Sequence, residues 1–220
     1  MSIDKNNLSQ YIEHTLLAPN VEANAIKDLC YEAIDNQFYG VCVPPYYVKN
    51  AHKFVEKTPV KVVTVIGFPM GYSTTPAKVE EVKKAFHEGA DEVDVVANVC
   101  AIKNKDWAYI RNDIQSITAA THLQGKVIKI ILETALLNDE EIKRICDICN
   151  ESMVNFVKTA TGFNQINTSP EVIRLLRSYI DKDIKIKASG GIRTTDEAIA
   201  LLNAGASRIG TSRSLQIIGI

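Results

Sequence analysis

The sequence has no long hydrophobic run and no excess of charge of either sign. Its longer apolar runs, such as Val127 to Leu132, contain Lys129 and fall far short of the roughly 20 residues that a membrane span needs. The net charge is -1 over 220 residues, without a basic or acidic block, which argues against nucleic-acid and membrane partners. The opening MSIDKNNLSQ contains no apolar signal segment. We therefore expect a cytoplasmic protein.

Cysteine and histidine are scarce and scattered. Five cysteines without an export signal favour free thiols over disulfides. Cys146 and Cys149 form a CxxC, but they lie in a stretch with helical periodicity and have no second pair, so two helix-face residues are the better interpretation than zinc ligands. The four histidines form no HxH or HExxH motif. We expect no metal ion.

What the sequence does contain is an alternation of strand-like and helix-like segments. Stretches of helical length separate short runs rich in valine and isoleucine and begin at capping residues such as Asn138, Ser169 and Thr195. A first strand is expected near His14 to Leu17, before a helix at Val21 to Gln37. Seven further strands are expected in the runs FYGVCVPP, KVVTVIGFP, DEVDVVANV, KVIKIILET, NFVKTATG, DIKIKASGG and SRIGTS.

Eight βα units in this length predict a closed (β/α)8 TIM barrel, an α/β fold. No linker or change of composition divides the chain, so we expect one domain over residues 1–220. A doubly wound open sheet is the alternative. It usually has fewer strands at this length and a GxGxxG first turn, which is absent.

Several expected strands carry charges where buried parallel strands should be apolar. Asp94, Lys158 and Lys187 come late in their runs, and active sites of barrels form at the carboxyl ends of the strands. Two ammonium groups near 4 Å repel by about 4 kcal/mol at an effective dielectric of 20, which favours a neutral, nucleophilic amine on one of them. We predict that Lys158 is the nucleophile, Lys187 its charged neighbour and Asp94 the proton-transfer group. Isolated strand-end salt bridges are the competing interpretation.

Other charged and polar residues of these strands are assigned lesser roles. We expect Lys129, Glu133 and Lys185 to be structural, either holding the three site residues or facing the helices. Cys42 is expected to line the mouth of the barrel without taking part in the chemistry.

Two glycine-containing turns follow the last two expected strands. Gly190 and Gly191 lead into a capped helix, and Gly210 and Ser212 precede another helix. Backbone N–H groups at such turns bind anions, and (β/α)8 enzymes commonly hold a phosphate after strands seven and eight. We predict a phosphate site made of these four residues and Gly162; tight βα turns alone are the other interpretation.

Over most of its length the chain resembles the deoxyribose-phosphate aldolase family. The resemblance lies in the segments HTLL, GVCVPP, VIGFPMG, GADEVDVVANV, KIILET, FVKTATGF and KASGGIRT. It implies a class I aldolase that reversibly cleaves 2-deoxy-D-ribose 5-phosphate to D-glyceraldehyde 3-phosphate and acetaldehyde, in deoxyribose phosphate catabolism. It further implies a Schiff base on Lys158, proton handling by Asp94 and Lys187, and no cofactor, because the lysine supplies the electron sink.

The resemblance is incomplete at two points. Glu13 stands where the family usually has an aspartate, and the tail SLQIIGI lacks the tyrosine of some members. Another class I aldolase of the same barrel, or a barrel that only binds phosphorylated metabolites, are the alternatives. The expected small-molecule partners are a phosphorylated sugar and acetaldehyde, and the quaternary structures considered are a homodimer or another homo-oligomer.

Overall fold

A computed structural model describes residues 7–164 and 167–220 of the chain. Eight parallel strands close into a barrel in the order β1 to β8, confirming the predicted (β/α)8 architecture. The strands are β1 (Ile12–Thr15), β2 (Gly40–Val43), β3 (Lys61–Ile66), β4 (Glu92–Val96), β5 (Val127–Ile131), β6 (Phe156–Lys158), β7 (Lys185–Ser189) and β8 (Arg208–Thr211). The first six residues, to which part of the signal-segment argument applies, lie outside the described residues.

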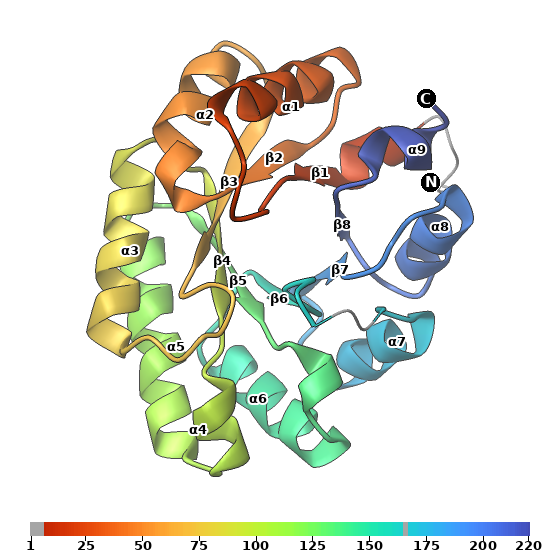
Figure 1. Ribbon diagram of the computed structural model, residues 1–220. Coiled ribbons are helices and arrows are strands. Elements are labelled where there is room, and N and C mark those ends of the chain that lie inside the picture. Colours follow the sequence, from red (N-terminus) through yellow and green to blue (C-terminus); the bar gives the residue numbers. More distant parts are fainter. Residues whose placement is uncertain (1–6, 165–166) are drawn as a thin grey trace.

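Helices surround the ring of strands, as Figure 1 shows. They are α1 (Ala23–Asp35), α2 (Val48–Val55), α3 (Thr75–His87), α4 (Val99–Lys103), α5 (Trp107–His122), α6 (Asp139–Glu151), α7 (Pro170–Tyr179), α8 (Thr195–Asn203) and α9 (Ser214–Ile218). Short 3-10 helices are η1 (Leu8–Tyr11), η2 (Pro45–Tyr47) and η3 (Thr134–Leu136). Within the described ranges, none of the helices combines the length and apolarity that crossing a membrane requires.

Side-chain caps fix where several crossover helices begin. Asn138 and Glu141 form a reciprocal capping box at α6, and the Ser169 hydroxyl accepts from the N–H of Val172 at α7. The cap of α8 is Thr194, paired with Glu197, and not Thr195 as the sequence suggested, because Thr195 already has helical backbone geometry. The caps of α7 and α8 mark where the loops after β6 and β7 end, and these loops carry Gly162, Gly190 and Gly191.

The main hydrophobic core lies between the strands and the helices. Outward-facing strand residues such as Val93 and Ile186 pack with helix residues such as Ile114 and Ile145. A second, small apolar cluster of Cys42, Val63 and Val65 lies apart from the main core. Because successive strand residues point to opposite faces, the other parity of each strand points into the barrel.

The first strand begins two residues earlier than expected, and this changes the barrel interior. Glu13 lies within β1, in register with Gly40 of β2 and Gly210 of β8. The expected strand at His14 to Leu17 left Glu13 outside the sheet. Its carboxylate is completely buried and belongs to the interior of the barrel.

Candidate active site

The barrel interior brings Asp94, Lys158 and Lys187 together. The Nζ atoms of both lysines donate to the same oxygen, Oδ2 of Asp94, at 2.8 Å from Lys158 and 2.6 Å from Lys187. Lys158 and Lys187 are cross-strand partners on β6 and β7, and Asp94 reaches them from β4. Asp94 and Lys187 lie in the middle of their strands rather than late in them, whereas Lys158 is the last residue of β6.

The same interior contains Lys129 and Glu13. Lys129 donates to Oδ1 of Asp94 at 3.0 Å, and its Nζ lies 2.5 Å from Oε2 of Glu92 and 3.5 Å from Oε1 of Glu13. Glu13 also forms a salt bridge with Lys187. Sequence reasoning assigned Lys129 a structural role and left Glu13 outside the strand. The signal that could have connected Lys129 with Asp94 is that both side chains point to the same face of the sheet.

A further polar layer lies nearer the amino-terminal ends of the strands. The hydroxyl of Tyr39 donates to Oε1 of Glu92 at 2.5 Å, and the Arg208 guanidinium lies 3.1 Å from the centre of the Tyr39 ring. Arg208 is also 3.4 Å from Oε1 of Glu13. The Phe156 ring lies beside this layer, with Arg208 5.6 Å from its centre. An unbroken chain of ion pairs and ring contacts therefore runs from this layer up to Lys158.

The ion pairs around Lys158 favour the charged forms of Asp94 and Lys187. Burial alone would raise the pKa of Asp94, but the ammonium groups of Lys129, Lys158 and Lys187 outweigh it and hold that pKa well below its usual value. Burial alone would lower the pKa of Lys187, yet the carboxylates of Asp94 and Glu13 raise it. Asp94 stands between Lys158 and Lys187, and therefore offsets the direct repulsion that the sequence led us to expect.

Three potential metal-ligating groups also meet here, but they do not fit a metal ion. Ligand atoms of Glu13, Cys42 and Asp94 lie within 4.8 Å of one another. Both carboxylates are already paired with lysine ammonium groups, which would repel a cation. Burial raises the pKa of the Cys42 thiol to about 11, so the thiolate that binds metals is scarce.

Four of the five residues predicted to bind phosphate follow the carboxyl ends of three adjacent strands. Gly162 follows β6, Gly190 and Gly191 follow β7, and Ser212 follows β8. Gly162, Gly190 and Gly191 have positive φ angles of 89°, 99° and 74°, a region that suits glycine and aims successive N–H groups differently from a strand. Gly210, in contrast, lies inside β8, where its missing side chain makes room for Lys187.

Glu133 holds the turn that carries Gly162. Its Oε2 accepts from the Thr161 hydroxyl at 2.5 Å and from the Thr161 N–H at 3.2 Å. Glu133 itself has a left-handed backbone, with φ of 43°, which is costly for a residue other than glycine. The sequence indicated a structural role for Glu133, and the contact specifies it: Glu133 positions the turn after β6.

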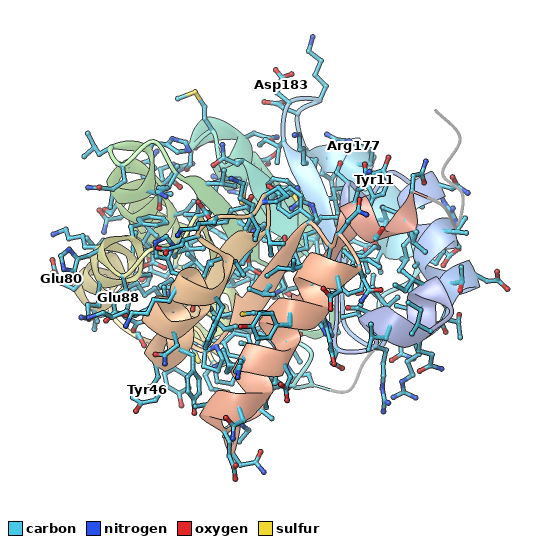
Figure 2. All side chains as sticks on the ribbon, turned by 90° about the horizontal axis from the view of Figure 1, so that it is seen from above. Tyr11, Tyr46, Glu80, Glu88, Arg177 and Asp183 are labelled. Carbon is cyan, nitrogen blue, oxygen red and sulfur yellow. The ribbon has the colours of Figure 1, made fainter. Side chains whose placement is uncertain are left out.

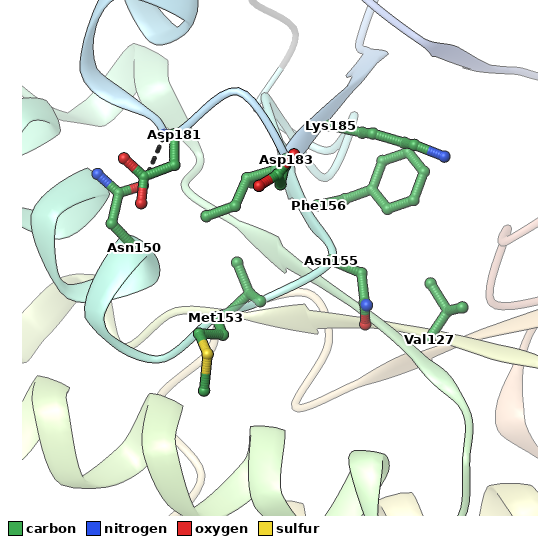
Figure 3. A pocket seen from close by; sticks show the side chains of 10 residues that line it. Val127, Asn150, Met153, Asn155, Phe156, Asp181, Asp183 and Lys185 are labelled. Carbon is green, nitrogen blue, oxygen red and sulfur yellow. Dashed lines mark hydrogen bonds between the residues drawn. The ribbon is translucent and has the colours of Figure 1, made fainter.

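A cavity lies at the end of the barrel opposite to these turns. In Figure 2, Asp183, which precedes β7, and Tyr46, which follows β2, mark the two ends. A cavity of about 470 Å³ near Asp183 is lined by residues that include Asn150, Met153, Phe156 and Lys185 (Figure 3). Asn150 accepts from the Asp181 N–H at 3.0 Å. Phe156 lines this cavity, and Nζ of Lys129 in the buried ion network lies 5.8 Å from the centre of its ring.

Comparison with known proteins agrees with the geometry. Residues 8–217 match the family described as DeoC/LacD family aldolase. The chain is similar to the deoxyribose-phosphate aldolases of Dictyoglomus turgidum (44% identity, over 98% of each chain) and Aciduliprofundum boonei (42% identity, over 98% of this chain and 97% of that one). It is also similar to the tetrameric deoxyribose phosphate aldolase structure from Aeropyrum pernix, with 30% identity, TM-score 0.91 and 98% and 91% of the two chains covered.

Proposed function

This chain belongs to the DeoC/LacD aldolase family, and from that premise we propose that it reversibly cleaves 2-deoxy-D-ribose 5-phosphate to D-glyceraldehyde 3-phosphate and acetaldehyde through a Schiff base on Lys158. The observation that carries the proposal is the shared acceptor, since Lys158 and Lys187 both donate to Oδ2 of one buried carboxylate, Asp94. This arrangement suits an amine that must exchange protons at each step of an imine reaction.

In the first stage, Lys158 attacks the aldehyde carbon C1 of the open-chain sugar. The amine forms a carbinolamine, which loses water to give an iminium ion that is covalently attached to Lys158. Asp94, the only salt-bridge partner of Lys158 among the described residues, relays to water the proton that Lys158 must release first. Lys187 donates to that same oxygen and is placed to return a proton to the departing hydroxyl.

In the second stage, the C2–C3 bond breaks. A base takes the proton of the C3 hydroxyl, C3 becomes the aldehyde of glyceraldehyde 3-phosphate, and the electrons of the C2–C3 bond form an enamine with the iminium carbon. A proton is then added to C2, and water hydrolyses the new iminium ion to release acetaldehyde. Once Lys158 carries a neutral enamine nitrogen, Asp94 has lost one neighbouring cation and becomes a better proton acceptor.

The phosphate of the substrate is proposed to bind at the turns after β6, β7 and β8. The proposed contacts are Gly162, Gly190, Gly191 and Ser212 in these turns, together with Gly210, which lies within β8 just before its turn. Support comes from the common end of the barrel at which these turns lie and from the positive φ angles of the first three glycines. Anchoring the phosphate there would place the far end of the sugar, with C1, near Lys158.

The cellular role and the assembly belong to the same proposal. An enzyme of this kind would consume the sugar phosphates released when deoxyribonucleotides are degraded, and it would act in the cytoplasm. A homo-oligomer is supported by the Aeropyrum pernix relative, which is described as tetrameric.

Reductive trapping tests the covalent step. Incubation with acetaldehyde and cyanoborohydride should add one ethyl group to the protein, and peptide mass spectrometry should place it on Lys158. Lys158→Met should abolish the adduct. Lys185→Met is the matched control, because Lys185 begins the neighbouring strand with an exposed side chain, and it should leave the adduct unchanged. An adduct on another lysine, or none, would overturn the mechanism and leave a barrel that only binds its ligand.

Substrate comparison tests the specificity. Acetaldehyde release should be measured from 2-deoxyribose 5-phosphate, from 2-deoxyribose and from other sugar phosphates in parallel. We expect the highest kcat/KM for 2-deoxyribose 5-phosphate. If Lys158 traps acetaldehyde but another phosphorylated sugar is cleaved faster, the Schiff base stands and the substrate assignment is wrong.

A further inference from the structure

The ion network inside the barrel carries unequal numbers of positive and negative groups. Its carboxylates are Glu13, Glu92 and Asp94, and its cations are Lys129, Lys158, Lys187 and Arg208, all of them buried and linked by salt bridges. With every group ionised, the network holds one positive charge in excess. Loss of one proton from one lysine would make it neutral, and a neutral network is favoured where water is scarce.

The three lysines differ in how firmly each is held. Lys129 lies within salt-bridge distance of three carboxylates, and Lys187 of two. Among the described residues, Lys158 forms a salt bridge with Asp94 alone. Carboxylate neighbours raise the pKa of Lys129 well above its usual value and raise that of Lys187, and Arg208 carries a guanidinium that does not lose its proton in proteins. Lys158 is therefore the lysine of the network with the fewest carboxylate partners.

We propose that Glu13, Glu92 and Lys129 are positioning residues for the aldol reaction. They balance the charges of the other buried groups, so that Lys158 is the lysine that gives up its proton. This inference rests on the proposed Schiff-base function and extends it from the residues that touch the substrate to the layers beneath them. Lys129 acts through Asp94, and Glu92 acts through Lys129. Glu13 acts through Lys187 and Lys129.

The remaining polar groups around the network do not change this balance. Burial raises the pKa of Cys42 on β2 to about 11 and raises that of Tyr39 just before β2, so both are neutral in the physiological range. Burial opposes the ionisation of Glu92, but Lys129 outweighs it and lowers the pKa of Glu92. Glu133, after β5, is engaged with Thr161 in the turn beyond β6.

A purely structural role for these residues makes a different prediction. If Glu13, Glu92 and Lys129 only held the strands together, their loss would slow the reaction at every pH. The acid midpoint of the pH–rate profile would not shift. Charge balance instead predicts shifts of opposite sign. Removing a carboxylate makes deprotonation of Lys158 easier, and removing Lys129 makes it harder.

The experiment measures the initial rate of cyanoborohydride trapping with acetaldehyde as a function of pH. Acetaldehyde has no phosphate, so the titration of the substrate does not enter the profile. Glu13→Gln and Glu92→Gln should each move the acid midpoint down by about 1 pH unit, and Lys129→Met should move it up by about 1 pH unit, the order expected for one nearby unit charge. Wild-type protein and Lys185→Met, which removes an exposed lysine outside the network, provide the reference midpoint.

A double variant separates the effect of charge from that of packing. It also keeps the test decisive if one of the single variants fails to fold. Glu92→Gln combined with Lys129→Met removes one charge of each sign from a contacting pair, so its midpoint should return to the reference value. The two glutamine variants and the double variant decide the question even if Lys129→Met fails to fold. Midpoints that do not move, or that move in the same direction for carboxylate and lysine variants, would overturn the inference while leaving the Schiff base intact. Absence of any adduct on wild-type Lys158 would overturn the proposed function itself.

Discussion

Gly210 lies so close to Lys187 that a β-carbon on Gly210 would stand 2.8 Å from Cε of Lys187. The pair links the last strand of the barrel to the lysine that shares Asp94 with Lys158. Gly210 does not have the positive φ angle found at the turn glycines. Its requirement is therefore for space beside Lys187 and not for an unusual backbone.

Gly210→Ala should consequently displace Lys187 from Asp94. We expect kcat to fall by at least about tenfold, which corresponds to a 1.4 kcal/mol rise in the barrier, and the free energy of unfolding to fall by about 1–3 kcal/mol, as is typical of overpacking. Steady-state kinetics and urea unfolding measure the two quantities. Ser207→Ala, just before β8, is the control and should affect neither; wild-type kcat in Gly210→Ala would refute the steric argument.

Two buried lysine–aspartate pairs allow catalysis to be separated from stability. Lys78 and Asp113 join α3 to α5 at 2.8 Å, away from the site, while Lys158 and Asp94 are 2.8 Å apart within it. Asp113→Asn and Asp94→Asn should each cost about 3–5 kcal/mol of unfolding free energy, because each leaves a buried ammonium group with a weaker partner.

Only Asp94→Asn should abolish activity per folded molecule. The comparison requires urea unfolding for stability and circular dichroism for the folded fraction, because trapping itself depends on Asp94. Equal loss of kcat in both variants would mean that Asp94 acts through stability alone.

The stability of the fold should depend on pH at both ends of the scale. The pKa values of Asp94 and Glu92 are lowered in the folded protein, so their contribution is present above about pH 4 and is lost as the pH falls through the folded values. The pKa values of Lys129 and Lys187 are raised, so their contribution is present below about pH 10.4 and is lost as the pH rises toward the folded values.

Urea unfolding between about pH 3 and pH 11 should therefore show a plateau from about pH 5 to pH 10 with a decline on either side. In the double variant of Glu92→Gln with Lys129→Met, both declines should be shallower. A wild-type protein whose unfolding free energy still rises above pH 10.4 would contradict the assignment for the lysines.

Glu133→Gln should weaken phosphate anchoring more than chemistry. The substitution weakens the acceptor that holds the Thr161 hydroxyl and N–H, and the turn containing Gly162 should become less ordered. We expect KM for 2-deoxyribose 5-phosphate to rise by about tenfold, the equivalent of 1.4 kcal/mol, with a smaller effect on kcat. The kcat/KM for 2-deoxyribose, which has no phosphate, serves as the control and should change little; equal losses for both substrates would contradict the positioning role.

Most of the architecture could be predicted from local pattern. The valine- and isoleucine-rich runs, the caps at Asn138 and Ser169 and the short turns between elements are local features, and they suffice to predict eight βα units. Errors were confined to boundaries, as at Thr195 and at the first strand. The shift of that strand mattered most, because it moved Glu13 from a loop into the barrel interior.

The sequence by itself determined the barrel and drew attention to Asp94, Lys158 and Lys187, because a charge in an otherwise apolar strand is visible without coordinates. Only the tertiary structure decided that one oxygen of Asp94 joins both lysines, that Glu13 and Lys129 complete the ion network, and that Gly210 makes room for Lys187. The physical reason is closure of the sheet. Residues on β1, β4, β5 and β7 are far apart in the chain. Strand pairing places Asp94 beside Lys129, and closure of the ring through β1 and β8 brings Glu13 to the lysines across the barrel interior.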